Sequence, residues 1–91
     1  MRLLWGPHAD PVMARLESDE SLTHVLRAVR RTLGRLELDP FDPRLRTRQF
    51  ATERYGQVRC TPVGTGEWRI FWMVGPAPGD ITIAFIAETS L

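Results

Sequence analysis

The stretch that decides the fold is Gln57-Val58-Arg59-Cys60-Thr61-Pro62-Val63, then a glycine turn, then Trp68-Arg69-Ile70-Phe71-Trp72-Met73-Val74. Both runs are rich in β-branched and aromatic residues, which favour strands, and Gly64-Thr65-Gly66 favours a turn. A third run, residues 81–87, follows the glycine- and proline-rich loop 75–79 and is apolar on both faces. The sequence therefore predicts an antiparallel meander whose last strand is central or covered.

The N-terminal part predicts one strand and two helices. Residues 2–5 form a short apolar run that ends at Gly6-Pro7, as a first strand would. Asp10-Pro11 predicts an N-cap and a first helical residue, for a short helix over residues 11–17. A longer helix follows, with one apolar stripe at spacings of three and four: Leu22, Val25, Leu26, Val29, Leu33 and Leu36. Asp39-Pro40 ends that helix.

Residues 44–54 are rich in arginine and predict a connecting loop with one helical turn. Pro62 predicts that its strand frays or lies at an edge there. The fold class that follows is α+β in a single domain over residues 1–91. A short N-terminal strand and two helices would pack on an antiparallel sheet of about four strands.

All twelve basic residues of this 91-residue chain are arginine, and the net charge is +1. The charge is uneven, because residues 24–59 hold nine arginines against four acidic residues, a local balance of +5. Such a zone suits a phosphate backbone or an acidic partner. A solvated helix face is the alternative.

Several classes of protein are disfavoured. The single Cys60 cannot form an internal disulfide and is interpreted as a small buried hydrophobe. His8 and His24, with one cysteine, do not make a metal site, so we expect no metal and no cofactor. The sequence has no run of about 20 apolar residues and no secretory leader, which predicts a cytoplasmic protein without a membrane span.

The order of elements and several short motifs resemble the RelE/ParE superfamily of bacterial toxins, which act in toxin–antitoxin pairs. The matching text is Gln57-Val58-Arg59-Cys60-Thr61, a glycine turn and Glu67-Trp68-Arg69-Ile70-Phe71-Trp72-Met73-Val74, with weaker matches at His8-Ala9-Asp10 and at Leu38-Asp39-Pro40 with Leu45. Two features depart from the family. The turn before Trp68 is longer, and Glu88-Thr89-Ser90-Leu91 stands where ribonuclease members carry an Arg, His or Tyr cluster.

The resemblance implies three catalytic candidates. Arg59 and Arg69, on adjacent strands, would stabilise phosphate if their side chains share a face. Tyr55 could act as acid, base or stacking platform, or could be a rim aromatic over the core. Arg69 could instead pair with Glu67 or Glu88. Strand alternation places Arg69 opposite the two tryptophans, which should lie under the helices, so Arg69 is expected on the open face.

Two further sets of residues are candidates for binding. The loop arginines would position RNA or else form a solvated loop: Arg44, Arg46, Arg48 and Arg54. Arg27 and Arg31 on the long helix would face an acidic antitoxin helix or solvent. Phe71 and Met73 are the large apolar residues expected to be exposed for a partner.

Three functions stay open. The first is a RelE-like mRNA endonuclease, with or without the ribosome, that forms a hetero-oligomer with its cognate antitoxin. The second is a ParE-like toxin that inhibits DNA gyrase and cleaves nothing. The third is a degenerate binding module of the same fold. The arginine-rich middle favours the first, and the absence of the C-terminal cluster favours the others.

Overall fold

The computed structural model describes residues 1–64 and 66–89; Thr65 of the predicted turn and Ser90-Leu91 of the C-terminal segment lie outside the described residues. Seven helices and strands follow one another along the described chain: β1 (Arg2–Trp5), α1 (Asp10–Ser18), α2 (Thr23–Leu38), β2 (Arg48–Thr52), β3 (Gly56–Pro62), β4 (Trp68–Val74) and β5 (Asp80–Glu88). Short 3₁₀ turns occupy Glu20–Leu22 and Pro43–Leu45.

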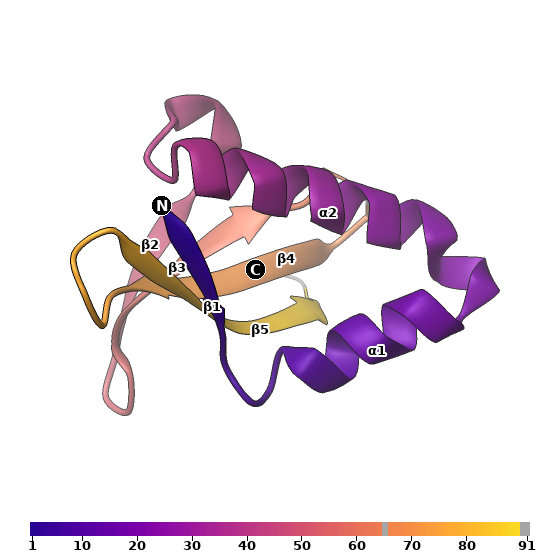
Figure 1. Ribbon diagram of the computed structural model, residues 1–91, viewed down its shortest axis with the longest axis horizontal. Helices are drawn as coiled ribbons and strands as arrows, with labels where there is room; N and C mark the ends of the chain where they lie inside the picture. Colours follow the sequence, from indigo (N-terminus) through magenta and orange to yellow (C-terminus); the bar gives the residue numbers. More distant parts are fainter. Residues whose placement is uncertain (65, 90–91) are drawn as a thin grey trace.

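The strands form one sheet in the order β1-β5-β4-β3-β2 (Figure 1). β1 runs parallel to β5, and between these two strands the chain passes through both helices and then through β2, β3 and β4. The other pairs are antiparallel. The prediction of about four antiparallel strands was therefore wrong in number and in direction: the sheet is five-stranded and mixed. The predicted central position of the last strand is confirmed, since β5 lies between β1 and β4.

β2 accounts for the missing strand. Residues 44–54 contain the expected helical turn, but Arg48–Thr52 form the edge strand where the sequence predicted a loop. All five β2 residues are exposed, so no alternation of apolar and polar residues marks the strand in the sequence. β2 pairs with β3 only from Gly56 to Cys60, so at Pro62 the strand β3 forms the edge of the sheet, as the proline ring predicted, while its other side pairs with Arg69 of β4.

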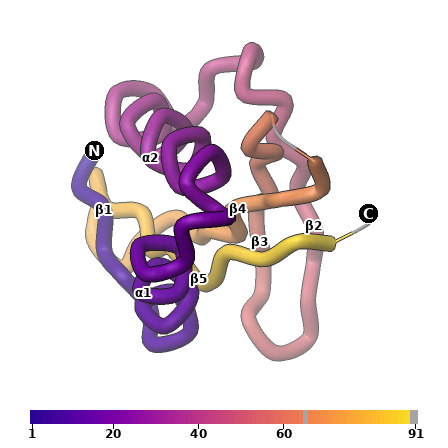
Figure 2. The backbone as a smooth tube through the Cα atoms, turned by 90° about the vertical axis from the view of Figure 1, so that its right-hand side faces the viewer, coloured from indigo at the N-terminus to yellow at the C-terminus, as the bar shows by residue number. Residues whose placement is uncertain are grey.

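Both helices pack on one face of the sheet, and the β2–β3 hairpin extends away from α2 (Figure 2). The predicted stripe of α2 is confirmed, because Val25, Val29, Leu33 and Leu36 are buried. The predicted cap of α1 was wrong, since Ala9 is the N-cap and Asp10 begins the helix. The Asp10 carboxylate there still lies in the first turn, where the helix dipole favours negative charge.

The sheet separates two apolar clusters, and β4 contributes to both. Trp68, Ile70 and Trp72 belong to the larger cluster under the helices. Phe71 packs with Val58 and Cys60 on the opposite face. The predicted orientation of β4 is thus confirmed, with both tryptophans under the helices.

A buried hydrogen-bond chain fixes this orientation. The Trp72 indole Nε1 donates to Thr61 Oγ1 at 2.8 Å, and the Thr61 and Thr47 hydroxyls are 2.7 Å apart. Trp72 and Thr61 are both 0% exposed. These hydrogen bonds satisfy polar groups that water cannot reach. They also connect β4, β3 and the segment before β2.

We expect Thr61→Val to lower the free energy of unfolding by about 2 kcal/mol, because the buried indole N–H loses its acceptor. Thr47→Val is the matched control. It leaves the Trp72–Thr61 bond in place and should cost less. Urea denaturation followed by tryptophan fluorescence measures both, and equal stability of Thr61→Val and the unaltered protein would contradict this account.

Candidate functional site

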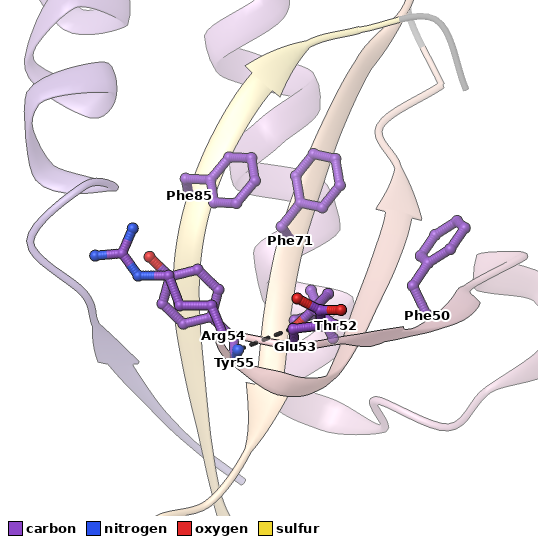
Figure 3. Close-up of a pocket in the computed structure, with 8 residues that line it drawn as sticks. Phe50, Thr52, Glu53, Arg54, Tyr55, Phe71 and Phe85 are labelled. Carbon is purple, nitrogen blue, oxygen red and sulfur yellow. Dashed lines mark hydrogen bonds between the residues drawn. The ribbon is translucent and has the colours of Figure 1, made fainter.

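A groove of about 560 Å³ lies on the sheet face opposite the helices (Figure 3). Its floor is the stacked pair Phe71 and Phe85, whose ring centroids are 4.3 Å apart at 15°. The residues that line it come from the β2–β3 hairpin and three strands: Phe50, Thr52, Glu53, Arg54, Tyr55, Val58, Phe71 and Phe85. The groove is an apolar hollow with two charged residues, Glu53 and Arg54, on the hairpin.

Hydrogen bonds within the hairpin turn stabilise its conformation. Thr52 Oγ1 accepts from the Tyr55 amide and donates to the Gly56 carbonyl, both at 2.9 Å. Gly56 has φ +68°, a conformation that side chains disfavour. The turn places Tyr55, 48% exposed, beside the groove, with the Arg54 guanidinium 5.4 Å from its ring centroid.

Three arginines surround a second hollow, of about 280 Å³, on the same face. Arg46, Arg48 and Arg69 line it together with Cys60 and Pro62. The register explains the grouping, because Arg48 pairs with Cys60 and Arg69 pairs with Pro62 across the sheet. Arg69 Nε donates to the Thr89 carbonyl at 3.3 Å, which holds the side chain beside β5. The open position predicted for Arg69 is confirmed.

Arg59 lies on the other face. Its guanidinium is 5.1 Å from the Phe41 ring centroid and 5.6 Å from that of Trp72, on the helix side. The expected sharing of a face by Arg59 and Arg69 was therefore wrong. Arg59 on β3 alternates with Val58 and Cys60, which point to the open face.

The alternative pairing of Arg69 with Glu88 is also excluded. Glu88 pairs with Trp68 in the register and lines a hollow on the helix side with Val12 and Arg15. The Arg69 side chain is on the opposite side of the sheet.

The four predicted loop arginines separate in space. Arg46 and Arg48 border the hollow with Arg69, and Arg54 lies at the groove. Arg44 instead forms an ion pair with Asp42 at 2.8 Å. The Arg44 guanidinium and backbone amide hold the pKa of Asp42 at about 2. Arg44 also lines a different hollow, next to Arg35 of α2.

The predicted partner residues are also separated. Arg27 and Arg31 are exposed on α2, on the helix side of the molecule. The predicted exposure of Phe71 was wrong: Phe71 is 9% exposed, because Phe85 and the strands around it cover the ring. Met73 is half-buried. The exposed aromatic residues of the open face are instead Phe50 and Tyr55.

The described residues give little support to histidine-based catalysis, a metal site or a membrane span. His8 and His24 are exposed, and neither lines the groove or the arginine hollow. Within residues 1–64 and 66–89, no group of three or more His, Cys, Asp or Glu lies close enough to hold a metal ion. Neither described helix is long and apolar enough to cross a membrane.

Comparison with solved structures decides the fold. One structure, described as a YoeB/ParE toxin from Agrobacterium tumefaciens, superposes with a TM-score of 0.78 over 99% of this chain and 100% of that chain, at 9% sequence identity. This chain has the YoeB/ParE toxin fold. The predicted RelE/ParE-like fold is thus confirmed. No protein-family model matches the sequence, and no curated protein matches it.

Sequence reasoning missed one residue of the groove for a specific reason. Strict alternation would place Phe85 with Ile81 and Ile83, under the helices. In this YoeB/ParE fold the register shifts, so that Phe71 pairs with Phe85 and Trp72 with Ile83, which leaves Ala84 without a partner. This bulge turns Phe85 to the open face, where Phe71 meets it.

Three further site residues were missed: Glu53, Phe50 and Cys60. The positions of Glu53 and Phe50 depend on β2, which the sequence did not reveal as a strand. Once Arg48–Thr52 is paired with β3, the turn after it must bring Glu53 to the end of the groove. Cys60 was expected to be buried, and it is, but between arginines.

Arg46 combines an exposed charge with an unfavourable backbone conformation. It closes the Pro43–Leu45 turn with φ +58°, which costs an L-residue other than glycine about 1 kcal/mol. Its side chain borders the arginine hollow and two neighbouring hollows. Strain of this kind is concentrated at functional positions.

We expect Arg46→Gly to raise the free energy of unfolding by about 0.5 kcal/mol, since glycine accepts this φ without strain but loses more backbone entropy on folding. Arg48→Gly is the control, and we expect it to lower the free energy of unfolding, because glycine weakens a strand. Urea denaturation measures both variants. A destabilised Arg46→Gly would mean that the Arg46 side chain stabilises the fold and is not free for a ligand.

Burial raises the pKa of the Cys60 thiol, although the Arg69 and Arg48 guanidiniums oppose the shift. At high pH the thiol ionises more readily in the unfolded chain than in the folded protein, and this difference lowers the free energy of unfolding. The contribution of the thiol to stability is therefore complete below its ordinary pKa and is lost as pH rises above about 8.5.

We expect iodoacetamide to alkylate Cys60 near neutral pH more slowly in the folded protein than in urea, because the raised pKa lowers the thiolate fraction and burial limits access to the sulfur. Mass spectrometry of the alkylated protein gives both rates. Cys60→Ala should flatten the alkaline part of the stability profile. Equal rates in the two states would show that the thiol is accessible.

Proposed function

We propose that this chain is the toxin of a toxin–antitoxin pair and that it cleaves mRNA bound across the open face of its sheet. The observation that carries the proposal is the position of Arg46, Arg48 and Arg69 around one hollow beside an aromatic groove. Guanidinium groups bind phosphate through two parallel hydrogen bonds, and aromatic rings stack with unpaired bases. Together they suit single-stranded RNA better than a duplex.

The arginines would hold the scissile phosphate. In metal-independent cleavage the ribose 2′-oxygen attacks phosphorus, its proton passes to a base, and the P–O5′ bond breaks as an acid protonates the leaving oxygen. Arg69 is the arginine we assign to the charged phosphorane, since the Thr89 carbonyl orients its side chain. Tyr55, at the groove, is the residue we assign as acid or base, since a phenol can serve in either role. Arg59 has no part in this assignment.

The remaining candidates have supporting roles. Arg46 and Arg48 would position the RNA backbone, and Arg54 would follow it along the groove. A cognate antitoxin, in a hetero-oligomer, would neutralise the protein in the cytoplasm by contacting α2 through Arg27 and Arg31 and the sheet beside Met73. Both arginines are exposed, and Arg30 on the same helix already attracts Glu17 at 3.8 Å.

One observation favours a second candidate. Neither histidine lines the open face, so the described site lacks the group that titrates nearest to neutral pH. A ParE-like toxin that binds DNA gyrase without cleavage, or a non-catalytic module of the same fold, needs no such group.

Induced expression in a bacterial host, with RNA sequenced for new 5′ ends and plasmid topology followed in parallel, separates these functions. We expect new ends within translated messages, growth arrest, and loss of both in Arg69→Ala. Arg31→Ala, an exposed arginine on the helix side, is the matched control and should keep the cleavage pattern. Intact messages with altered supercoiling would replace the proposal with gyrase inhibition, and no effect on growth would leave only the binding module.

Binding in solution tests the arginine hollow separately. Log Kd for single-stranded RNA should vary with log salt, and Arg46→Ala or Arg48→Ala should each reduce the slope by ~0.7, the share of one phosphate contact. Fluorescence anisotropy at several salt concentrations gives the slopes. An effect of Arg27→Ala as large as that of Arg48→Ala would place the RNA elsewhere.

A further inference from the structure

We propose that the aromatic groove is a base site, which takes one unstacked nucleobase of the RNA whose phosphate the arginine hollow holds. The inference deepens the proposed function and rests on it. Its observation is independent of the arginines: a hollow of about 560 Å³, walled by aromatic rings, is open on the same face.

The rings of the groove suit a flat ligand. Phe71 and Phe85 form a stacked floor, and the exposed Tyr55 and Phe50 come from the hairpin at its side (Figure 3). Tyr55 is not needed by the core, since almost half of its surface is exposed. Aromatic residues left exposed beside a basic hollow are typical of proteins that bind single strands by stacking.

The spacing of the two hollows matches a phosphate and an adjacent base. Val58 lines the groove and Cys60 lines the arginine hollow, on the same face of β3. Two residues along a strand cover about 7 Å, comparable to the span of one nucleotide. A nucleotide with its phosphate between Arg48 and Arg69 can thus place a neighbouring base in the groove, beside Phe71.

Charge argues for RNA against a protein side chain as the occupant. Arg46, Arg48, Arg54 and Arg69 surround the two hollows, and among the described lining residues only Glu53 is acidic. An uncharged apolar side chain would leave these guanidiniums without a counter-charge, whereas a nucleotide supplies an anion and a ring together.

Glu53 gives the site a preference among bases. A carboxylate accepts hydrogen bonds and donates none, so it favours a base edge with adjacent N–H groups. Guanine offers two such donors side by side, while uracil offers one between two carbonyl oxygens. We therefore expect guanine to bind best in this groove.

The test uses the full chain and a short single-stranded RNA, with and without one abasic position. We expect the abasic RNA to bind roughly tenfold more weakly, because one stacked base is lost. Tyr55→Ala should remove this difference and Tyr55→Phe should keep it. Phe41→Ala, at an aromatic residue that is 55% exposed on the helix side, is the matched control and should also keep it. Circular dichroism verifies that each variant is folded.

The outcomes separate the two proposals. Equal, salt-dependent binding of intact and abasic RNA would overturn the base site and leave the phosphate contacts standing. Absence of RNA binding at every salt concentration would overturn both. If Tyr55→Ala weakened only the binding of an acidic peptide with one large apolar side chain, the groove would be a protein site and the base site would be wrong.

A second oligonucleotide pair tests Glu53. Replacing one guanine by inosine removes one of the two adjacent donors, and we expect binding to weaken several-fold. Glu53→Gln should reduce that discrimination, and Arg54→Gln, a neighbouring loss of charge, should not. Discrimination unchanged in Glu53→Gln would overturn the role of this carboxylate.

Discussion

The hydrogen bond from the Trp72 indole to Thr61 is the constraint on which the rest of the structure depends. A buried indole N–H without an acceptor is costly, so Trp72 must lie where Thr61 can accept, on the helix side of β3 and β4. Thr47 extends the chain to the segment before β2. Once this face is set, period-two geometry places Arg69 and Phe71 on the opposite side.

The two faces of the sheet therefore differ in what they contribute to the protein. The helix face buries most of the core, including Ile70 and Leu36, and supplies the stability of a small domain. The open face carries a second, smaller cluster that no described helix covers. A bulge at Ala84 enlarges it by turning Phe85 toward Phe71. An uncovered apolar groove of this kind is typical of a binding site.

Arginines with the same charge differ in role because of where the strands place them. Arg2 pairs with the buried Asp80 through two 3.2 Å contacts and holds β1 to β5, while Arg59 lies against the rings of Phe41 and Trp72. These two are engaged by the fold. Arg48 and Arg69 have guanidiniums beside an open hollow, which is the arrangement that leaves charge available for an anion.

The sequence by itself determined the helices, four of the five strands and the orientation of β4, because periodic burial leaves a pattern that local chemistry can reveal. It also showed the arginine-rich zone from which Arg46 and Arg48 come. Only the tertiary structure decided that Arg48–Thr52 is a strand, that Arg59 is separated from Arg69, and that Phe85 faces the groove. An exposed edge strand has no burial pattern, and strand register and bulges are set by pairing between segments distant in sequence.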